Sequence, residues 1–215
     1  MDYQNKSERY YSKVRQEMKK YLPENAERII DVGCGNGSFA SGIRKESGAE
    51  VWGVEYTQEG AQEAEKVLDK VFSGSCEENL KSLPDHYFDV AFFNDVLEHM
   101  PDPAKLLSEF KLKMAPGGIV ISSIPNIRYH NALLPILFKK DFRYKSSGVM
   151  DYTHLRFFTS KSITRLFEEQ GYEVIVHEGI NRSKSLKPVL YNIPLLFTQM
   201  DIFYPQFATV AKVVK

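Results

Sequence analysis

Short runs that are apolar almost throughout alternate along the chain with segments in which apolar positions recur every three or four residues. Runs of the first kind are typical of strands covered on both faces, and segments of the second kind are typical of helices with one buried face. The runs predict strands at residues 28–32, 50–55, 70–73, 88–94, 118–124, 173–178 and 208–214. The alternation of strands and helices predicts an α/β fold with a doubly wound, largely parallel sheet.

Two of the predicted helices carry signals at both ends. Asp102 is a capping carboxylate, Pro103 suits the first helical turn, and Pro116 stops the segment. The buried face predicted for this helix consists of Leu106, Leu107, Phe110 and Met114. A second helix is predicted to open at residue 159 or 160 and to end at Gly171.

Three segments lie outside the alternation. Residues 6–21 predict an amphipathic N-terminal helix that ends at Pro23 and packs on the sheet. Residues 125–159 form a long connection rich in Tyr, Phe, Arg and His, and connections of that length in a compact domain are usually lids or binding loops. Residues 183–207 form a second irregular insert, which we interpret as a cap or an oligomer contact.

Composition narrows the class of protein. The 215 residues, 43% of them hydrophobic, suit one domain with a sizeable core. Because 28 Lys and Arg balance 28 Asp and Glu, no overall positive charge attracts nucleic acid, and we expect no such partner. Cys34 and Cys76 are too few for a disulfide framework, which favours a reducing compartment, and we expect a cytoplasmic protein. Their spacing matches no metal-ligand motif, so we expect no metal site. Residues 1–15 lack the apolar stretch of a secretory signal, and we expect no membrane span.

A glycine-rich turn, with Gly33, Gly35 and Gly37, follows the first predicted strand and precedes a helix. Glycines let a backbone approach a ligand closely, and the start of a helix supplies free N–H groups. Glu55 follows Gly35 by twenty residues, at the end of the second predicted strand, where a carboxylate can accept both hydroxyls of a ribose. This arrangement favours a nucleotide-like ligand over a bare turn and a surface glutamate.

Residues 29–37, Ile-Ile-Asp-Val-Gly-Cys-Gly-Asn-Gly, resemble the first motif of class I S-adenosylmethionine methyltransferases. A dinucleotide fingerprint, as in a dehydrogenase, has its third glycine one residue later. Residues 88–99 resemble the fourth-strand motif of the methyltransferases, and residues 115–118 resemble their turn before the fifth strand. The resemblance implies a Rossmann-like seven-stranded sheet in the order 3-2-1-4-5-7-6 with strand seven antiparallel, and S-adenosylmethionine as the cofactor.

The same resemblance assigns roles to residues. The glycine turn would wrap the methionine part of the cofactor, and Glu55 would bind the ribose. Tyr11 is added for another reason: it lies one position round from the apolar stripe of the predicted N-terminal helix and could cover the cofactor as a lid. Many family members have an aspartate at the position of Ser75, so a carboxylate contact to the adenine is missing here and Cys76 contributes its backbone N–H. The implied cofactor-binding residues are Tyr11, Asp31, Gly33, Gly35, Gly37, Glu55, Tyr56, Ser75, Cys76, Asn94 and Asp95.

A narrower resemblance concerns residues 10–15, 123–126 and 151–159, which look like a bacterial branch often found alongside glycosyltransferases. It implies a role in polysaccharide biosynthesis, with a hydroxyl of a sugar or sugar-linked small molecule as the acceptor. Methylation of a phenol, a quinone precursor or another small metabolite stays open, as does a non-catalytic scaffold that only binds the cofactor, because a fold and a cofactor do not fix the acceptor.

A hydroxyl acceptor must lose a proton, and histidine suits that task near neutral pH. His154 is our first choice, because Asp151 could orient it and Arg156 could bind an anionic group of the acceptor. His99 and His130 are the alternatives, and a purely structural role stays open for each of the three. The predicted acceptor-binding residues are Arg128, Tyr129, His130, Tyr152 and Arg156.

We therefore expect a single domain over residues 1–215. Its parts are an N-terminal helix or lid (1–24), a cofactor-binding half (25–124), an acceptor-site insert (125–159) and a C-terminal half with a cap (160–215). The expected partner is a small-molecule or glycan acceptor, and the sequence leaves the oligomeric state open, a homodimer included.

Overall fold

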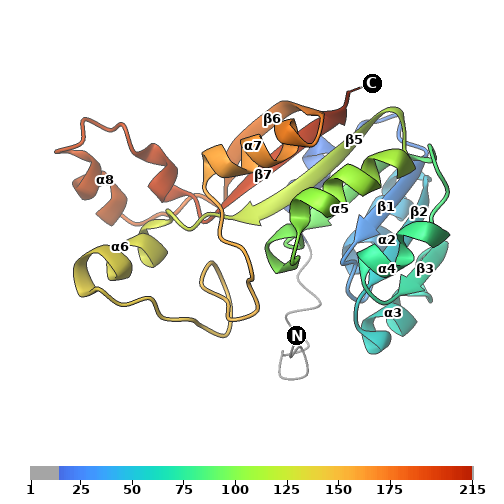
Figure 1. Cartoon of the computed structure of the whole chain (residues 1–215), viewed down its shortest axis with the longest axis horizontal. Helices are drawn as coiled ribbons and strands as arrows, with labels where there is room; N and C mark the ends of the chain where they lie inside the picture. The colour runs from blue at the N-terminus through green and yellow to red at the C-terminus, as the bar shows by residue number, and fades with distance from the viewer. Residues whose placement is uncertain (1–14, 215) are drawn as a thin grey trace.

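One sheet runs through the computed structural model, which describes residues 15–214. Its strands are β1 (Arg28–Val32), β2 (Glu50–Glu55), β3 (Lys70–Ser73), β4 (Phe88–Asn94), β5 (Met114–Pro125), β6 (Tyr172–Ile180) and β7 (Gln206–Val213). They lie in the order β3-β2-β1-β4-β5-β7-β6 (Figure 1). β1 to β5 are parallel, and β7 is antiparallel to both β5 and β6. The predicted seven-stranded fold and strand order are confirmed.

The first four strands have the predicted bounds, whereas β5 begins earlier than predicted. Phe88 pairs with Met114 and Val90 pairs with Ile119, so residues 115–118 bulge out of the ladder while the strand continues on both sides. The prediction that Met114 belongs to the preceding helix was wrong. That helix ends at Phe110, a 3-10 turn follows over residues 111–113, and Met114 is the first residue of β5.

Helices cover both faces of the sheet (Figure 1). The α-helices are α2 (Ser38–Ser47), α3 (Gln58–Ala64), α4 (Cys76–Asn79), α5 (Pro103–Phe110), α6 (His130–Lys139), α7 (Ser160–Glu169) and α8 (Lys187–Asn192). The 3-10 helices are η1 (Gln16–Tyr21), η2 (Leu80–Ser82), η3 (Leu97–His99), η4 (Lys111–Lys113) and η5 (Met200–Phe203). As predicted, the Asp102 and Thr159 side chains cap α5 and α7, each accepting a backbone hydrogen bond from the first turn.

Neighbouring residues of β4 pack against different helix layers. Phe93 meets Phe110 of α5 with the rings edge to face and their centroids 5.1 Å apart. Phe92, on the other face, meets Phe39 of α2 with the same geometry and separation. Burial on both faces explains why β4 is apolar almost throughout, and it fixes the position of the polar residues that follow the strand.

The N-terminal segment is described from Arg15 onward. Within that part, η1 replaces the last turns of the helix predicted for residues 6–21, and Met18 is fully buried in the cluster that contains Ile29 and Ile43. Tyr11, the predicted lid over the cofactor, lies outside the described residues.

Residues 128–145 and 182–201 form a lobe beyond the carboxyl end of β5, with α6 and α8 side by side (Figure 1). The first of these segments was predicted as an irregular connection, but it contains the ten-residue helix α6, which continues past Pro135. Asn126, fully buried, donates from its side chain to the carbonyls of Asp201 and Tyr204 and so ties the two segments together. Across residues 15–214, no helix has the length and apolar character needed to cross a bilayer.

Candidate functional site

A cavity of about 650 Å³ lies at the carboxyl ends of β1, β2, β4 and β5. In a doubly wound sheet this edge is where ligands bind, because the connections on either side of β1 leave in opposite directions. Segments distant in the sequence complete the wall, namely Arg15 and Glu17, residues 147–154 of the insert, and Asn181 with Gln206 from the last two strands.

The glycine turn borders the cavity and adopts the left-handed conformation that favours glycine, with φ of 73° at Gly33 and 56° at Gly35. A Cβ on Gly33 would lie 2.7 Å from the Val96 side chain. Gly37 is different, because it does not line the cavity and a Cβ there would lie 2.9 Å from Val67 and 3.2 Å from Ala64. The structure thus explains Gly37 by helix packing, and its predicted contact with the cofactor stays a prediction.

Glu55 ends β2 with its carboxylate buried at the cavity wall. One oxygen accepts a hydrogen bond from the backbone N–H of Gly35 at 2.9 Å. The other accepts from the backbone N–H and the hydroxyl of Thr57, at 2.8 and 2.7 Å. Glu55 therefore fixes the glycine turn as well as facing the position predicted for a ribose.

Asp31, the last but one residue of β1, is buried beside Glu55 at the floor of the cavity. Burial, and secondarily the charge of Glu55, raises the pKa of Asp31 to about 8. Burial also raises the pKa of the neighbouring Cys34 thiol well above its usual range. Cys34 is thus a packing residue of the turn rather than a nucleophile.

A second, smaller cavity of about 330 Å³ continues from the first and shares Gly33, Tyr56 and His99 with it. Its far end is formed by Ser75, which caps α4, and by the buried Cys76. These are the residues that the sequence predicted to border an adenine, and the cavity walls are mostly apolar at this end. Gly33 of the glycine turn borders both cavities, whereas Glu55 lines the larger one.

Asn94 and Asp95 follow β4 and line the larger cavity. Both polar atoms of the Asn94 side chain are buried without a hydrogen-bond partner among residues 15–214, which marks a place for a polar ligand group. Asp95 forms an ion pair with Arg15 and accepts a hydrogen bond from Gln206. Arg15 in turn donates to Gln206 at 2.9 Å, so these three side chains close one wall.

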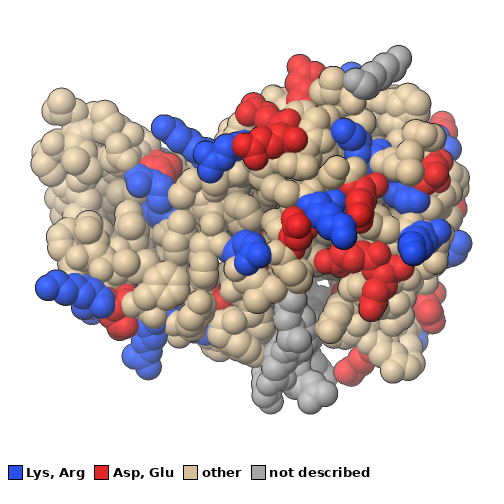
Figure 2. Space-filling model, viewed as in Figure 1, with Lys and Arg blue, Asp and Glu red and all other residues tan. Residues whose placement is uncertain are grey.

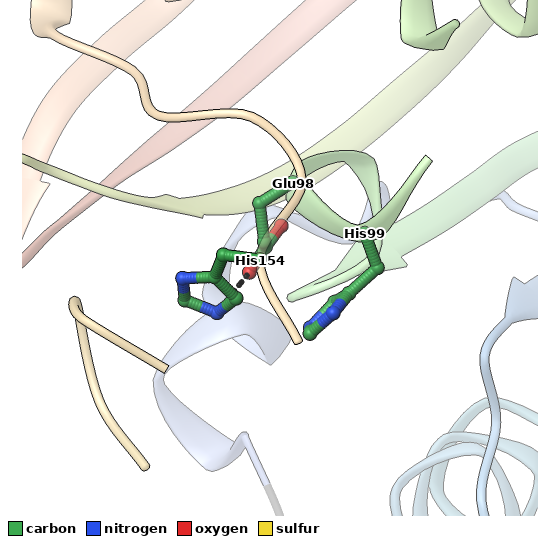
Figure 3. Close-up of side chains that lie close together, drawn as sticks. All are labelled: Glu98, His99 and His154. Carbon is green, nitrogen blue, oxygen red and sulfur yellow. Dashed lines mark ion pairs between the residues drawn. The ribbon is translucent and has the colours of Figure 1, made fainter. Parts of the chain in front are cut away.

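Glu98, His99 and His154 gather where the insert passes over η3 (Figure 3). The backbone N–H groups of Leu155 and Arg156 donate to the Glu98 carbonyl and hold the insert there. His99 Nδ1 lies 3.1 Å from the Thr153 carbonyl, and His154 Nδ1 lies 3.0 Å from the Val149 carbonyl. A carbonyl only accepts, so each Nδ1 carries a proton, and in the neutral form of each ring Nε2 is the basic nitrogen.

The Glu98 carboxylate is 1% exposed, and neither oxygen has a hydrogen-bond partner within residues 15–214. His154 Nε2 lies 3.9 Å from Glu98 Oε1 and can form an ion pair with it when the imidazole is protonated. One ligand atom from each of Glu98, His99 and His154 lies within 4.8 Å of the others, a grouping that could hold a metal ion. The arrangement offers either a proton acceptor or a cation site at the cavity wall.

Burial raises the pKa of Glu98 from 4.5 to about 8. Between these values the folded protein keeps a proton that the unfolded chain has lost, so this group makes the free energy of unfolding fall as pH rises from about 4.5 to about 8. We expect Glu98→Gln to be more stable than the parent protein at pH 8, by about 1 to 3 kcal/mol, with a smaller gain at pH 5. Urea unfolding at both pH values measures this, with the exposed Glu109→Gln as control; equal gains at the two pH values would contradict it.

Of the predicted acceptor residues and base, His154 alone lines the cavity. The Arg128 guanidinium pairs with Asp201 and donates to Gln199 within the lobe. His130 Nε2 lies 3.2 Å from the Ser183 hydroxyl, and the Tyr129 ring packs on His130. Arg156 donates to the carbonyls of Pro101 and Leu155, and Tyr152 lies at the surface.

The insert does supply a cavity wall, through residues 147–149, Asp151 and His154. Acceptor binding by Arg128, Tyr129, His130, Tyr152 and Arg156 stays a prediction.

Sequence reasoning missed Arg15, Glu98, Asn181 and Gln206 as residues of the cavity wall. Glu98 offered one signal, a glutamate inside an otherwise apolar run at the end of a buried strand. Arg15 directly precedes η1, Asn181 directly follows β6 and Gln206 begins β7, so the fold brings them to the site from distant parts of the chain.

The family model described as "Methyltransferase domain" matches residues 3–177. The ubiquinone biosynthesis O-methyltransferase of Aeromonas salmonicida is 29% identical over 161 residues, which cover 72% of this chain and 66% of that protein. The protein of the same name from Colwellia psychrerythraea is 31% identical over 163 residues, covering 72% and 64%. The chain thus spans just under two thirds of the length of these relatives.

A solved structure described as a SAM dependent methyltransferase from Archaeoglobus fulgidus superposes with a TM-score of 0.71. It is 24% identical and covers 91% of each chain. A second, described as a possible histamine N-methyltransferase from Thermotoga maritima, has a TM-score of 0.63 at 22% identity and covers 93% of this chain and 86% of its own. At these identities the superpositions establish a shared fold.

Proposed function

The chain belongs to the methyltransferase domain family, and on that premise we propose that it transfers a methyl group from S-adenosylmethionine to a hydroxyl of a sugar or a sugar-linked small molecule. The observation that carries methyl transfer is the paired cavity at the carboxyl ends of β1 and β4, where Glu55, Asn94 and the glycine turn meet. When bound, S-adenosylmethionine supplies an electrophilic methyl group.

The residues present fit this cofactor. The buried Asn94 amide, without a partner in the described chain, suits the polar methionine end. Glu55 has about four lone-pair sites and accepts three hydrogen bonds within the chain, so one site is open to a ribose hydroxyl and a second opens if the Thr57 hydroxyl turns away. The second cavity, between Tyr56 and Cys76, has the apolar lining that an adenine needs.

We expect Glu55→Ala to weaken S-adenosylmethionine binding about 30- to 150-fold, since two charge-assisted hydrogen bonds are worth roughly 2 to 3 kcal/mol. Loss of the Gly35 hydrogen bond adds to the effect by loosening the turn. Titration calorimetry measures it, with Glu50→Ala, at the opposite end of the same strand, as the matched control. An unchanged affinity would disprove the ribose assignment.

Within the proposal, His154 takes the proton of the acceptor hydroxyl. Its Nδ1–H is held by the Val149 carbonyl, so Nε2 is the basic nitrogen, and the side chain lines the cavity. Glu98, 3.9 Å away, would stabilise the imidazolium that forms where its own carboxyl is ionised, which its raised pKa of about 8 places at the alkaline side of neutral. Alignment of the acceptor by the cavity walls supplies the remainder of the rate enhancement.

The same cluster also fits a divalent cation, although the sequence predicted no metal site. Both histidines have the Nδ1–H to carbonyl hydrogen bond that orients a metal-ligating imidazole, and Glu98 would supply a carboxylate. Methyl transfer measured after treatment with EDTA separates the two roles. Full activity supports His154 as the base, whereas a loss that Mg²⁺ or Mn²⁺ reverses would make it a ligand.

The acceptor assignment rests on the likeness of residues 123–126 and 151–159 to methyltransferases found alongside glycosyltransferases, and it implies a place in polysaccharide biosynthesis. The second candidate acceptor is a phenolic or quinone precursor, which the names of the curated relatives favour. Incubation with radiolabelled S-adenosylmethionine and a panel of nucleotide sugars, lipid-linked glycans and catechols decides between them. Label in catechols alone would overturn the sugar acceptor, and cofactor binding without transfer to any of them would favour a scaffold.

A further inference from the structure

The lobe carries apolar side chains on its outside. Leu137 and Phe138 of α6, Leu186 and Leu190 around α8, and Leu196 and Phe197 after it are each at least half exposed, and Leu196 reaches 83%. We call these six residues the cap surface. Scattered single apolar residues need no explanation, but a group of this size on one small lobe marks a contact surface.

The two helices that carry the cap surface are joined at its centre. The ring of Phe138 stacks on that of Tyr191 across the gap between α6 and α8, with centroids 6.5 Å apart and planes 27° apart. The exposed apolar side chains of α6 and α8 therefore lie on adjoining helices of one lobe.

The loop at the tip of this region has an unusual backbone. Leu196 and Phe197 have φ of 49° and 57°, a left-handed conformation that large apolar residues seldom adopt. Asn192, fully buried, holds the loop by donating to the Pro188 and Gln199 carbonyls and accepting from Gln199 N–H. The strained tip is thus fixed by the lobe with its two large side chains in solvent.

The lobe carries an excess of positive charge. Residues 128–145 and 182–201 contain eight Lys and Arg but only two Asp, in a chain whose total charge is zero. Arg128 and Asp201 pair with each other, which leaves seven basic residues against Asp141. Figure 2 shows the lobe as a mostly uncharged surface with Lys and Arg at its edges.

We propose that the cap surface docks the protein on an anionic lipid bilayer. Exposed Leu and Phe side chains enter the boundary between headgroups and acyl chains, while Lys139, Lys140 and their basic neighbours meet the phosphates. A second copy of the chain is a poorer occupant, because a two-fold contact would bring two basic rims together. Docking of this kind is peripheral and would place the cavity beside the membrane surface.

Co-sedimentation of the full chain with vesicles tests the proposal. We expect at least about tenfold stronger binding to vesicles of equal parts phosphatidylcholine and phosphatidylglycerol than to phosphatidylcholine alone, since each basic residue near an anionic surface adds to the attraction. Binding should weaken as salt is raised. Equal binding to both vesicles, or to neither, overturns the proposal.

Variants separate the cap surface from general stickiness. Phe138→Glu with Leu196→Asp should lower binding at least about tenfold, whereas Leu112→Asp, an equally apolar and half-exposed site on η4, should leave it unchanged. Lys139→Gln with Lys140→Gln should weaken binding more than Lys45→Gln with Lys81→Gln, exposed lysines on α2 and η2.

Two further results bear on the occupant. Gly35→Val should not bind cofactor, yet we expect it to bind vesicles as the parent protein does. Vesicle binding and the proposed methyl transfer can therefore be tested independently of each other. If light scattering shows a dimer that Phe138→Glu with Leu196→Asp dissociates, and vesicle binding is absent, the cap surface joins two copies and the bilayer is wrong.

Discussion

Gly35→Val is expected to abolish binding of S-adenosylmethionine and of its demethylated product, with affinity lower by ~100-fold or more, about 3 kcal/mol or above. Gly35 has a φ of 56° and lines the larger cavity. A β-branched residue is strained in that conformation, and its side chain takes up space that the ligand needs. Movement of the turn would also break the hydrogen bond from Gly35 N–H to Glu55. Titration calorimetry measures the loss.

Gly48→Val is the matched control for this substitution. Gly48 ends α2 with a φ of 71°, and a Cβ there would meet nothing within 4 Å. The control therefore carries similar backbone strain away from the cavity, and we expect it to lose some stability but to bind cofactor normally. Circular dichroism should show both variants folded. Normal binding by Gly35→Val would mean that the ligand does not approach this turn.

His154→Ala is expected to lower the turnover rate by ~100-fold or more, the usual worth of a positioned base, while the affinity for S-adenosylmethionine stays unchanged. Single-turnover transfer of labelled methyl to the acceptor identified in the panel measures the rate. The pH profile should change as well, since the base that must be deprotonated before transfer is gone.

Because His154 is buried and bonded to Val149, a structural loss must be separated from a chemical one. His154→Asn keeps a donor for the Val149 carbonyl but supplies no base, so it should fold like the parent and remain slow. His86→Ala removes an exposed histidine that does not line the cavity and should retain turnover. Full activity of His154→Asn would transfer proton removal to His99, His130 or solvent.

The sequence was a reliable guide where the determinants are local. β1, β2 and β4 are largely apolar runs closed by turns, and the glycine turn with Glu55 is set by spacing along one strand–helix–strand unit. β5 was misjudged at its start because Pro116 and Gly117 usually end an element. Here the bulge opposite Phe88 absorbs them and the strand continues.

The acceptor side could not be read in the same way. Glu98 and His154 are 56 residues apart in the sequence, and they meet because backbone N–H groups of the insert bond to the Glu98 carbonyl. Arg128 looked like a ligand for an anion because its partner, Asp201, follows 73 residues later. Long-range pairing of this kind depends on the path of the chain, which local patterns do not encode.

The place of β7 has a consequence for synthesis of the protein. Residues 206–213 leave the ribosome after all the other strands, yet β7 lies between β5 and β6 and bonds to both. Until then the nascent chain has β5 as an open edge, and β6 has no neighbour in the sheet. Gln206, which orders Arg15 and Asp95 at the cavity, also arrives with this strand. Cofactor binding is therefore expected to follow the synthesis of the whole sheet, and the incomplete sheet is a stage at which the nascent protein is exposed to aggregation.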